Sequence, residues 1–220
     1  MKRLQIAAGT AFVGAWIVGV VLAASGPTPD DSAAKITSYF AGHEQRSMVA
    51  HFLIDGLAGL AIVAIAFSLY GYLDGSTRLR RLILGAGIAA GVASLGQMIV
   101  GETLSYRAAH GASVDSVKTL FTALNDGDTF KIAFLALMIG SASLLALRRG
   151  AFPRWLGIAG LLFAPLLAVS GLAFPLESDA LYASLELTLL GLLSWVVAAT
   201  VVVARRAPNA EAVATAAALS

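Results

Sequence analysis

The sequence predicts an all-α integral membrane protein, a bundle of six transmembrane helices with both termini in the cytoplasm. Three observations support this fold class. The 220 residues are 58% hydrophobic and only 13% charged, with a mean hydropathy of +0.82, whereas a soluble domain is roughly one quarter charged. Six stretches are apolar for about 20 residues, the length that a helix needs to cross a bilayer core of about 30 Å. The charges are also sorted by sign, with basic residues gathered on alternate connections between these stretches.

The six predicted spans form one domain over residues 1–206. They cover about 5–24, 48–73, 82–104, 129–147, 155–174 and 181–204. Helices are predicted because the bilayer core offers no partners for backbone groups, and a closed barrel would show short alternating strands instead.

The first span has an alternative interpretation as a signal peptide. It follows Lys2 and Arg3, and the small residues Ala23, Ala24 and Ser25 could mark a cleavage site. Its apolar run is longer than the roughly 7–15 residues of a usual signal core. We therefore expect an uncleaved first helix.

Basic clusters predict the orientation of the bundle. Four clusters hold ten of the fifteen Lys and Arg residues: Lys2 and Arg3; Arg78, Arg80 and Arg81; Arg148, Arg149 and Arg154; Arg205 and Arg206. With six spans, all four fall on one side, and basic loops face the cytoplasm. Eleven of the thirteen acidic residues, all but Asp74 and Glu211, fall on the other side. The chain is therefore expected in the cell membrane as a multi-pass protein.

The connections on the acidic side are longer than those on the basic side. Residues 25–47 contain the stretch DDSAAKITSYFAGHEQRS, which predicts a short interfacial helix. Residues 105–127 and 175–180 are the other two outer connections. Residues 207–220 are Ala-rich and polar, and we expect a flexible cytoplasmic tail.

Two carboxylates that lie well inside predicted spans are the candidates for catalysis, Asp55 and Glu186. Asp55 is seven residues into its span, about 10 Å deep at 1.5 Å per residue. A charge at mid-span costs at least about 2.5–3.5 kcal/mol, so such residues usually face a bundle interior or a wet cavity. His51 lies one turn before Asp55, and Tyr182 lies one turn before Glu186. The alternative for Asp55 and His51 is a capping or interhelical pair near the headgroups.

Four further residues are candidates for ligand binding: Gln97, Glu102, Asp128 and Lys131. Asp128 could instead cap the fourth span, since acids complement the dipole of a helix N-terminus. Lys131 could snorkel outward, or neutralise Asp55, Glu102 or Glu186. If these side chains converge, they form an outward-facing polar pocket with a net negative charge.

Several classes of site are not expected. The chain has no Cys, and its three His residues are scattered, so neither a metal site nor a disulfide is predicted. No nucleotide-binding or hydrolase motif is present, so no cofactor is predicted. The basic clusters are topology signals, which argues against nucleic acid as a partner. The expected partner is the lipid bilayer, with a small molecule or protons as ligand.

Three segments resemble a bacterial family of small polytopic membrane proteins that has no assigned function. They are TSYFAGHEQRSMVAHFLID on the outer side, the span AIVAIAFSLYGYL, and LALRRGAFPRWLGIAGLL leading into the fifth span. The last is the most specific, with a basic turn, a Pro and then Arg-Trp-Leu-Gly. The resemblance implies a six-helix membrane domain and assigns no catalytic or binding residue.

Three functions remain open from the sequence. The first is binding or movement of a small ligand or protons through the outer pocket. The second is a membrane-embedded acid/base enzyme, such as a cyclase, acting on an apolar, isoprenoid-like substrate. In that case an apolar cavity lined by aromatic residues is expected beneath the acids. The third is a non-catalytic assembly subunit, in which the Gly-rich face around Gly91 packs against another protein.

Overall fold

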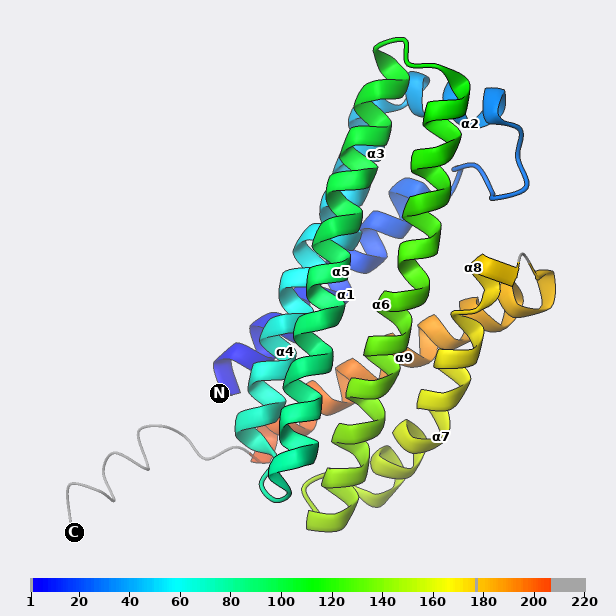
Figure 1. Cartoon of the computed structure of the whole chain (residues 1–220). Coiled ribbons are helices and arrows are strands. Elements are labelled where there is room, and N and C mark those ends of the chain that lie inside the picture. Colours follow the sequence, from blue (N-terminus) through cyan, green and yellow to red (C-terminus); the bar gives the residue numbers. More distant parts are fainter. Residues whose placement is uncertain (1, 177, 207–220) are drawn as a thin grey trace.

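The computed structural model describes residues 2–176 and 178–206 as a bundle of helices, with no strand among them (Figure 1). The elements are α1 (Lys2–Ala23), α2 (Ala33–Gly42), α3 (Glu44–His51), the π-helix η1 (Phe52–Leu57), α4 (Ala58–Tyr72), α5 (Thr77–Ala109), α6 (Val114–Arg149), α7 (Arg154–Ser170), α8 (Ala173–Leu176) and α9 (Asp179–Arg206). Six segments are long and apolar enough to span a membrane: Lys2–Ala23, Glu44–Tyr72, Thr77–Ala109, Val114–Arg149, Arg154–Leu176 and Ala180–Arg206. The all-α fold with six candidate spans is confirmed. The tail predicted over 207–220 lies outside the described residues.

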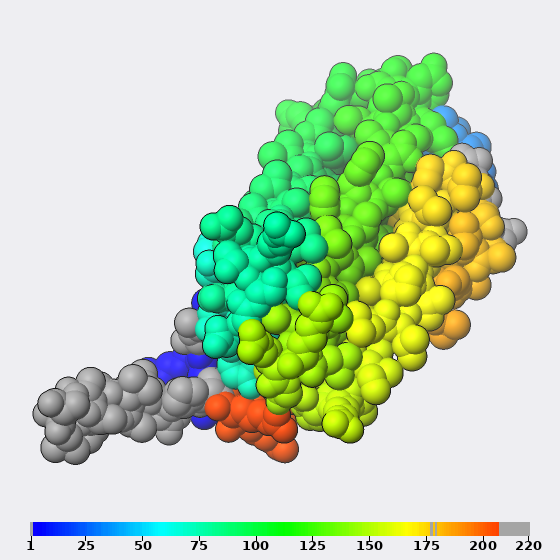
Figure 2. All heavy atoms as spheres, turned by 60° about the horizontal axis from the view of Figure 1, so that its bottom comes forward, coloured from blue at the N-terminus to red at the C-terminus, as the bar shows by residue number. Residues whose placement is uncertain are grey.

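The basic clusters meet at one end of the bundle, which we call the basic end. There, Arg206 on α9 donates a hydrogen bond to the carbonyl of Ala151 at 3.1 Å, and Tyr72 donates to the same carbonyl at 3.3 Å. The start of α1 lies beside the end of α9, where the side chain of Gln5 donates a hydrogen bond to the hydroxyl of Thr200 at 3.2 Å. Figure 2, with this end turned forward, shows the end of α9 next to the α4–α5 and α6–α7 turns. The opposite, acidic end holds the α5–α6 turn and the connection from α1 to α2.

The α5–α6 hairpin is longer than the two spans predicted from its sequence. These helices have 33 and 36 residues, or about 50 Å each at 1.5 Å per residue. The predicted outer connection over 105–127 is therefore helical apart from a short turn at 110–113. Ser113 caps α6 by accepting a hydrogen bond from the backbone N–H of Ser116, and α6 ends at Gly150, whose φ of 65° is left-handed.

A second, smaller core covers the outer half of this hairpin. Its buried side chains come from α2, α5 and α6: Ile36, Phe40, Leu104, Ala108, Val117, Phe121 and Leu124. The side chain of Lys118 on α6 donates to the carbonyls of Pro29 and Asp31, at 2.6 and 3.2 Å, which fixes the connection leading into α2. The short helix predicted for residues 30–47 is confirmed as α2, followed by the start of α3.

The Gly-rich face of α5 packs inside the bundle. A Cβ on Gly91 would collide with Val63 of α4, and a Cβ on Gly87 would collide with Ala66. Small residues allow such close helix approach in membranes. The face around Gly91 is therefore already used within the chain, which removes the basis for predicting that it docks a partner protein.

The second span contains an irregularity that bears on the site. Residues 44–72 run as α3, η1 and α4 without a break, and η1 is a π-helical stretch with the sequence FLIDGL. π-helical turns are rare and occur frequently at functional sites. Asp55 lies in this stretch, and His51 immediately precedes it.

Candidate functional site

A buried ion pair joins the second and fourth spans. Nζ of Lys131 on α6 donates to Oδ1 of Asp55 on η1 at 2.9 Å. Asp55 is only 4% exposed, and the side chain of Lys131 is 11% exposed. Pairing reduces the cost that either charge would carry alone in an apolar interior. Of the two roles that the sequence leaves open for Lys131, snorkelling outward or neutralising an acid, the structure shows pairing with Asp55.

Asp128 is the second carboxylate on the same ammonium group. Its Oδ1 lies 2.6 Å from Nζ of Lys131, one turn along α6, and its side chain is 26% exposed. The alternative of Asp128 as a helix cap is wrong, because α6 begins at Val114 and Asp128 lies in its interior. Lys131 is thus shared by two carboxylates from different helices.

His51 completes the group on the side facing the acidic end. Its Nδ1 lies 3.5 Å from Oδ2 of Asp55, a long contact, and the imidazole is largely buried. The ring is stacked at 6.3 Å from Phe40 of α2. On its other side is Gly101 of α5, where a Cβ would lie 2.6 Å from Nδ1. Phe40 and the bare backbone at Gly101 therefore hold the imidazole beside Asp55.

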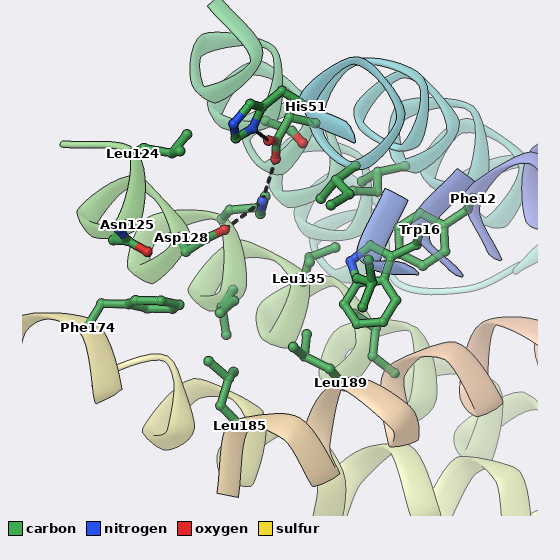
Figure 3. A pocket seen from close by; sticks show the side chains of 18 residues that line it. Phe12, Trp16, His51, Leu124, Asn125, Asp128, Leu135, Phe174, Leu185 and Leu189 are labelled. Atoms are coloured by element: carbon green, nitrogen blue, oxygen red, sulfur yellow. Dashed lines mark hydrogen bonds and ion pairs between the residues drawn. The ribbon is translucent and has the colours of Figure 1, made fainter. Parts of the chain in front are cut away.

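This charged group forms one wall of a cavity of about 200 Å³. The remaining lining is mostly apolar and comes from α1, η1, α4, α6, α8 and α9: Phe12, Trp16, Val20, Ile54, Ile62, Leu124, Ile132, Leu135, Phe174, Leu185, Leu189 and Leu192. Figure 3 shows Phe174, Leu185 and Leu189 on the side facing the ion pairs, with Trp16 and Phe12 closing one flank. The pocket is thus an apolar chamber with one charged wall, rather than the polar pocket predicted from the sequence.

One hydroxyl on the cavity wall lacks a partner. Ser94 on α5 lines the cavity and is 1% exposed. Its Oγ has no hydrogen-bond partner among the described residues. Because buried polar atoms are nearly always paired, Ser94 is a group that a bound molecule could satisfy.

A second chamber of about 180 Å³ lies between the cavity and the acidic end. It is bounded by the end of α1, by α2 and by α6, and includes Tyr39 and Phe40. Four residues line both chambers: His51, Ile54, Leu124 and Asn125. We call this space the outer chamber. The four shared residues form the wall between the outer chamber and the inner cavity.

Gln97 and Glu102, both on α5, make no hydrogen bond or ion pair with the described residues of the charged group. Gln97 is buried and donates to the carbonyl of Leu124 at 2.8 Å, tying α5 to α6. Glu102 is partly exposed and forms no hydrogen bond or ion pair within the described residues, although its charge interacts with His51.

The two candidates on α9 lie differently from each other. Glu186 is exposed and makes no ion pair with a described residue, whereas its neighbour Leu185 lines the cavity. Tyr182 stacks edge-to-face on Phe174 at 5.6 Å and so supports a residue of the cavity wall. Of the four charges predicted to converge, the structure brings together Asp55 and Lys131 but not Glu102 and Glu186.

Several residues of the cavity lining are not among the site residues predicted from the sequence. Ser94 is hidden in a run of small residues, and the aromatic lining comes from helices that are distant in sequence, α1 and α8. Asn125 lies within α6 and lines the cavity. A polar residue one turn from Asp128 on the same helix was the available signal for it.

The group is suited to binding or proton transfer. It offers carboxylate acceptors, an ammonium donor and an imidazole beside an apolar space, the composition typical of small-molecule pockets. Within the described residues, no group of three or more His, Asp or Glu side chains could hold a metal ion.

Comparisons with known proteins give no relative for this chain. No family model, no curated protein and no solved structure matches it. The resemblance to a bacterial membrane family stays a prediction. The structure and composition place the chain among helical proteins whose apolar helices are consistent with a multi-pass membrane protein.

Proposed function

We propose that the protein binds a small, partly apolar molecule within the membrane, with the polar group of the ligand at Asp55, Lys131 and Asp128. The observation that supports this most directly is the placement of this buried charged group on one wall of an otherwise apolar cavity. The charges cost free energy in that position, and charged residues within membrane spans usually mark a ligand or ion pathway. Binding of this kind is the first step of either storage or transport.

The cavity is large enough for a ring and one polar substituent. Its volume is about 200 Å³, and a dry cavity of about 150 Å³ holds benzene. The outer chamber adjoins the cavity through four shared lining residues on the side of the acidic end, and we propose it as the side from which a ligand enters.

We further propose that the acidic end faces outward and that both termini are cytoplasmic. The support is the gathering of the basic clusters at one end, as the positive-inside rule requires. The cell membrane and membership of the resembled bacterial family belong to the same proposal. Labelling of single Cys residues placed at the exposed positions Val114 and Ser76 by a membrane-impermeant reagent tests it, with only the first expected to react in intact cells.

Thermal unfolding with three small aromatic compounds tests ligand binding. Benzyl alcohol, benzylamine and benzoate differ in the charge of the polar group. At least one should raise the melting temperature of the detergent-solubilised protein, since a ligand at 100 times its Kd stabilises by about 2.7 kcal/mol. Leu189→Trp, which fills the cavity, should remove the effect. Leu190→Trp, on the exposed side of α9, should retain it.

Two results would contradict the proposal. One is no stabilisation of the wild-type protein by any of the three compounds. The other is equal stabilisation of Leu189→Trp and Leu190→Trp, which would assign the effect to the detergent or the outer surface.

A second candidate function, acid/base catalysis on an apolar substrate, is favoured by one observation. The imidazole of His51 lies beside Asp55 at the edge of an apolar, aromatic-lined cavity, and such a pair is suited to proton transfer. Incubation with an isoprenoid diphosphate or an isoprenoid alkene, followed by product analysis, distinguishes it from binding alone. Turnover lost in Asp55→Asn would support the enzyme.

A further inference from the structure

We propose that the cavity takes a lipophilic monocation, an aryl- or alkylammonium, and that this cation competes with a proton on His51. The inference rests on the proposed binding function and adds the ligand class and a coupling to protons.

The charge balance of the group motivates the ligand class. Asp55 and Asp128 bring two negative charges, and Lys131 brings one positive charge. While His51 is neutral, the group therefore has a net charge of −1 beside an apolar space. An unbalanced charge is costly in such surroundings, so the group favours one further positive charge. A carboxylate ligand would instead face two carboxylates.

The cavity has the other groups that an aromatic or alkyl ammonium needs. Asp128 is partly exposed and lines the cavity, so it can accept a hydrogen bond from the ligand. The unpartnered Oγ of Ser94 is a second acceptor on the wall. Aromatic side chains Trp16, Phe12 and Phe174 line the apolar part, and aromatic faces attract cations.

His51 is the other position for the compensating charge. Its Nδ1 already lies 3.5 Å from Asp55, an ion pair when the ring is protonated. A proton there brings the group to neutrality without a ligand. Because either charge alone is sufficient, binding of the cation and protonation of His51 oppose each other, and thermodynamic linkage makes this opposition reciprocal.

Charged and titratable groups reach His51 from three of the packed helices besides its own. Asp55 is on η1 of the same span, Glu102 interacts with it from α5, and Lys131 and Asp128 face it across Asp55 from α6. From α2, the Tyr39 phenol lines the outer chamber that His51 borders, alongside apolar Phe40.

The α1 residues of the outer chamber, Leu22 and Ala23, are apolar. His51 borders both chambers, so a proton reaches it from the acidic end while the ligand occupies the inner cavity.

The pH dependence of benzylamine affinity tests the inference. Benzylamine, an alkylammonium, stays protonated between about pH 5.5 and 7.5, so its own charge is constant over this range. The Kd of the wild-type protein should fall by up to about tenfold per pH unit as the pH rises through this range. In His51→Gln, benzylamine should still bind, with a Kd that no longer changes with pH. Benzyl alcohol, which is uncharged, is the matched ligand and should show no pH dependence in either protein.

A second measurement needs no variant. Mixing the wild-type protein with benzylamine at about pH 6.5 in weak buffer should release protons, up to one per bound ligand, and benzyl alcohol should release none.

The outcomes separate the two levels of the proposal. Binding of benzyl alcohol or benzoate without benzylamine overturns the ligand class and leaves the binding function standing. A pH-independent Kd for benzylamine in the wild-type protein, or a pH dependence that persists in His51→Gln, overturns the competition at His51. Absence of binding by all three compounds overturns the binding function itself.

Discussion

Lys131→Met should be the most destabilising single substitution in the charged group, because both carboxylates depend on this ammonium. Without it, Asp55 and Asp128 face each other with no cation, and Asp55 is 4% exposed. Removing one partner of a buried ion pair costs about 3–5 kcal/mol. We expect a loss in this range.

Asp55→Asn should cost less, because Lys131 keeps Asp128 at 2.6 Å. What is lost is one charge-assisted hydrogen bond, about 1.5–3 kcal/mol. The double variant Asp55→Asn/Lys131→Met leaves only Asp128, whose side chain is 26% exposed. The loss of stability in the double variant should therefore be smaller than the sum of the losses in the two single variants, by an interaction energy of about 0.5–3 kcal/mol.

Thermal unfolding followed by circular dichroism measures these differences. For a chain of this length, 1 kcal/mol corresponds to roughly 2–4 °C, so Lys131→Met should lower Tm by roughly 6–20 °C. Lys35→Met, which removes an exposed lysine from its pair with Asp31, is the control and should hardly change Tm. The reasoning is refuted if Lys131→Met behaves like this control, or if Asp55→Asn is the more damaging change.

Three further substitutions test the surroundings of the site. Gly101→Ala should displace the His51 ring and lower the free energy of unfolding by about 1–3 kcal/mol. Gly96→Ala on the same helix, where a Cβ meets open space, is the control and should be neutral. The melting temperatures of the two variants are compared. Leu104→Ala should cost about 2–5 kcal/mol through the small core, and equal protease resistance of the α5–α6 hairpin before and after the change would contradict it. Ser113→Ala should lower the free energy of unfolding by about 1 kcal/mol, because it removes the cap of α6. Amide hydrogen exchange should become faster in the first turn of α6 and stay unchanged near Gly150.

The apolar runs and the energetic cost of charge made much of this protein predictable. A carboxylate about 10 Å inside a span is costly, so its position alone marks it as a candidate. Asp55 could be identified from the sequence for this reason. His51 followed from helical spacing, and Lys131 followed as the available cation. The basic clusters predicted which connections share one end of the bundle.

Other features depend on tertiary structure that a single sequence does not reveal. Depth along a helix does not give direction, so Glu186 looked equivalent to Asp55. Glu186 follows the cavity-lining Leu185 and points about 100° away from it around the helix, so its side chain is exposed.

The sequence predicts a connection over residues 105–127, where the outer half of the α5–α6 hairpin is helical. Its residues are too polar for a span and are held as helix by packing against α2. The π-helical turn at Asp55 has no signature in the hydrophobic pattern.

Quenching of Trp16 fluorescence tests the central claim, that the charged cavity holds a small ligand, most directly. Trp16 lines the cavity, and Trp155 is exposed on α7. Two proteins are compared, one with Trp16 and one with Trp155 as its single tryptophan, each titrated with 4-bromobenzylamine, whose bromine quenches tryptophan at short range. The account predicts saturable quenching of Trp16 and only weak, non-saturable quenching of Trp155. Quenching of Trp16 that does not saturate, or that is no stronger than that of Trp155, would contradict it.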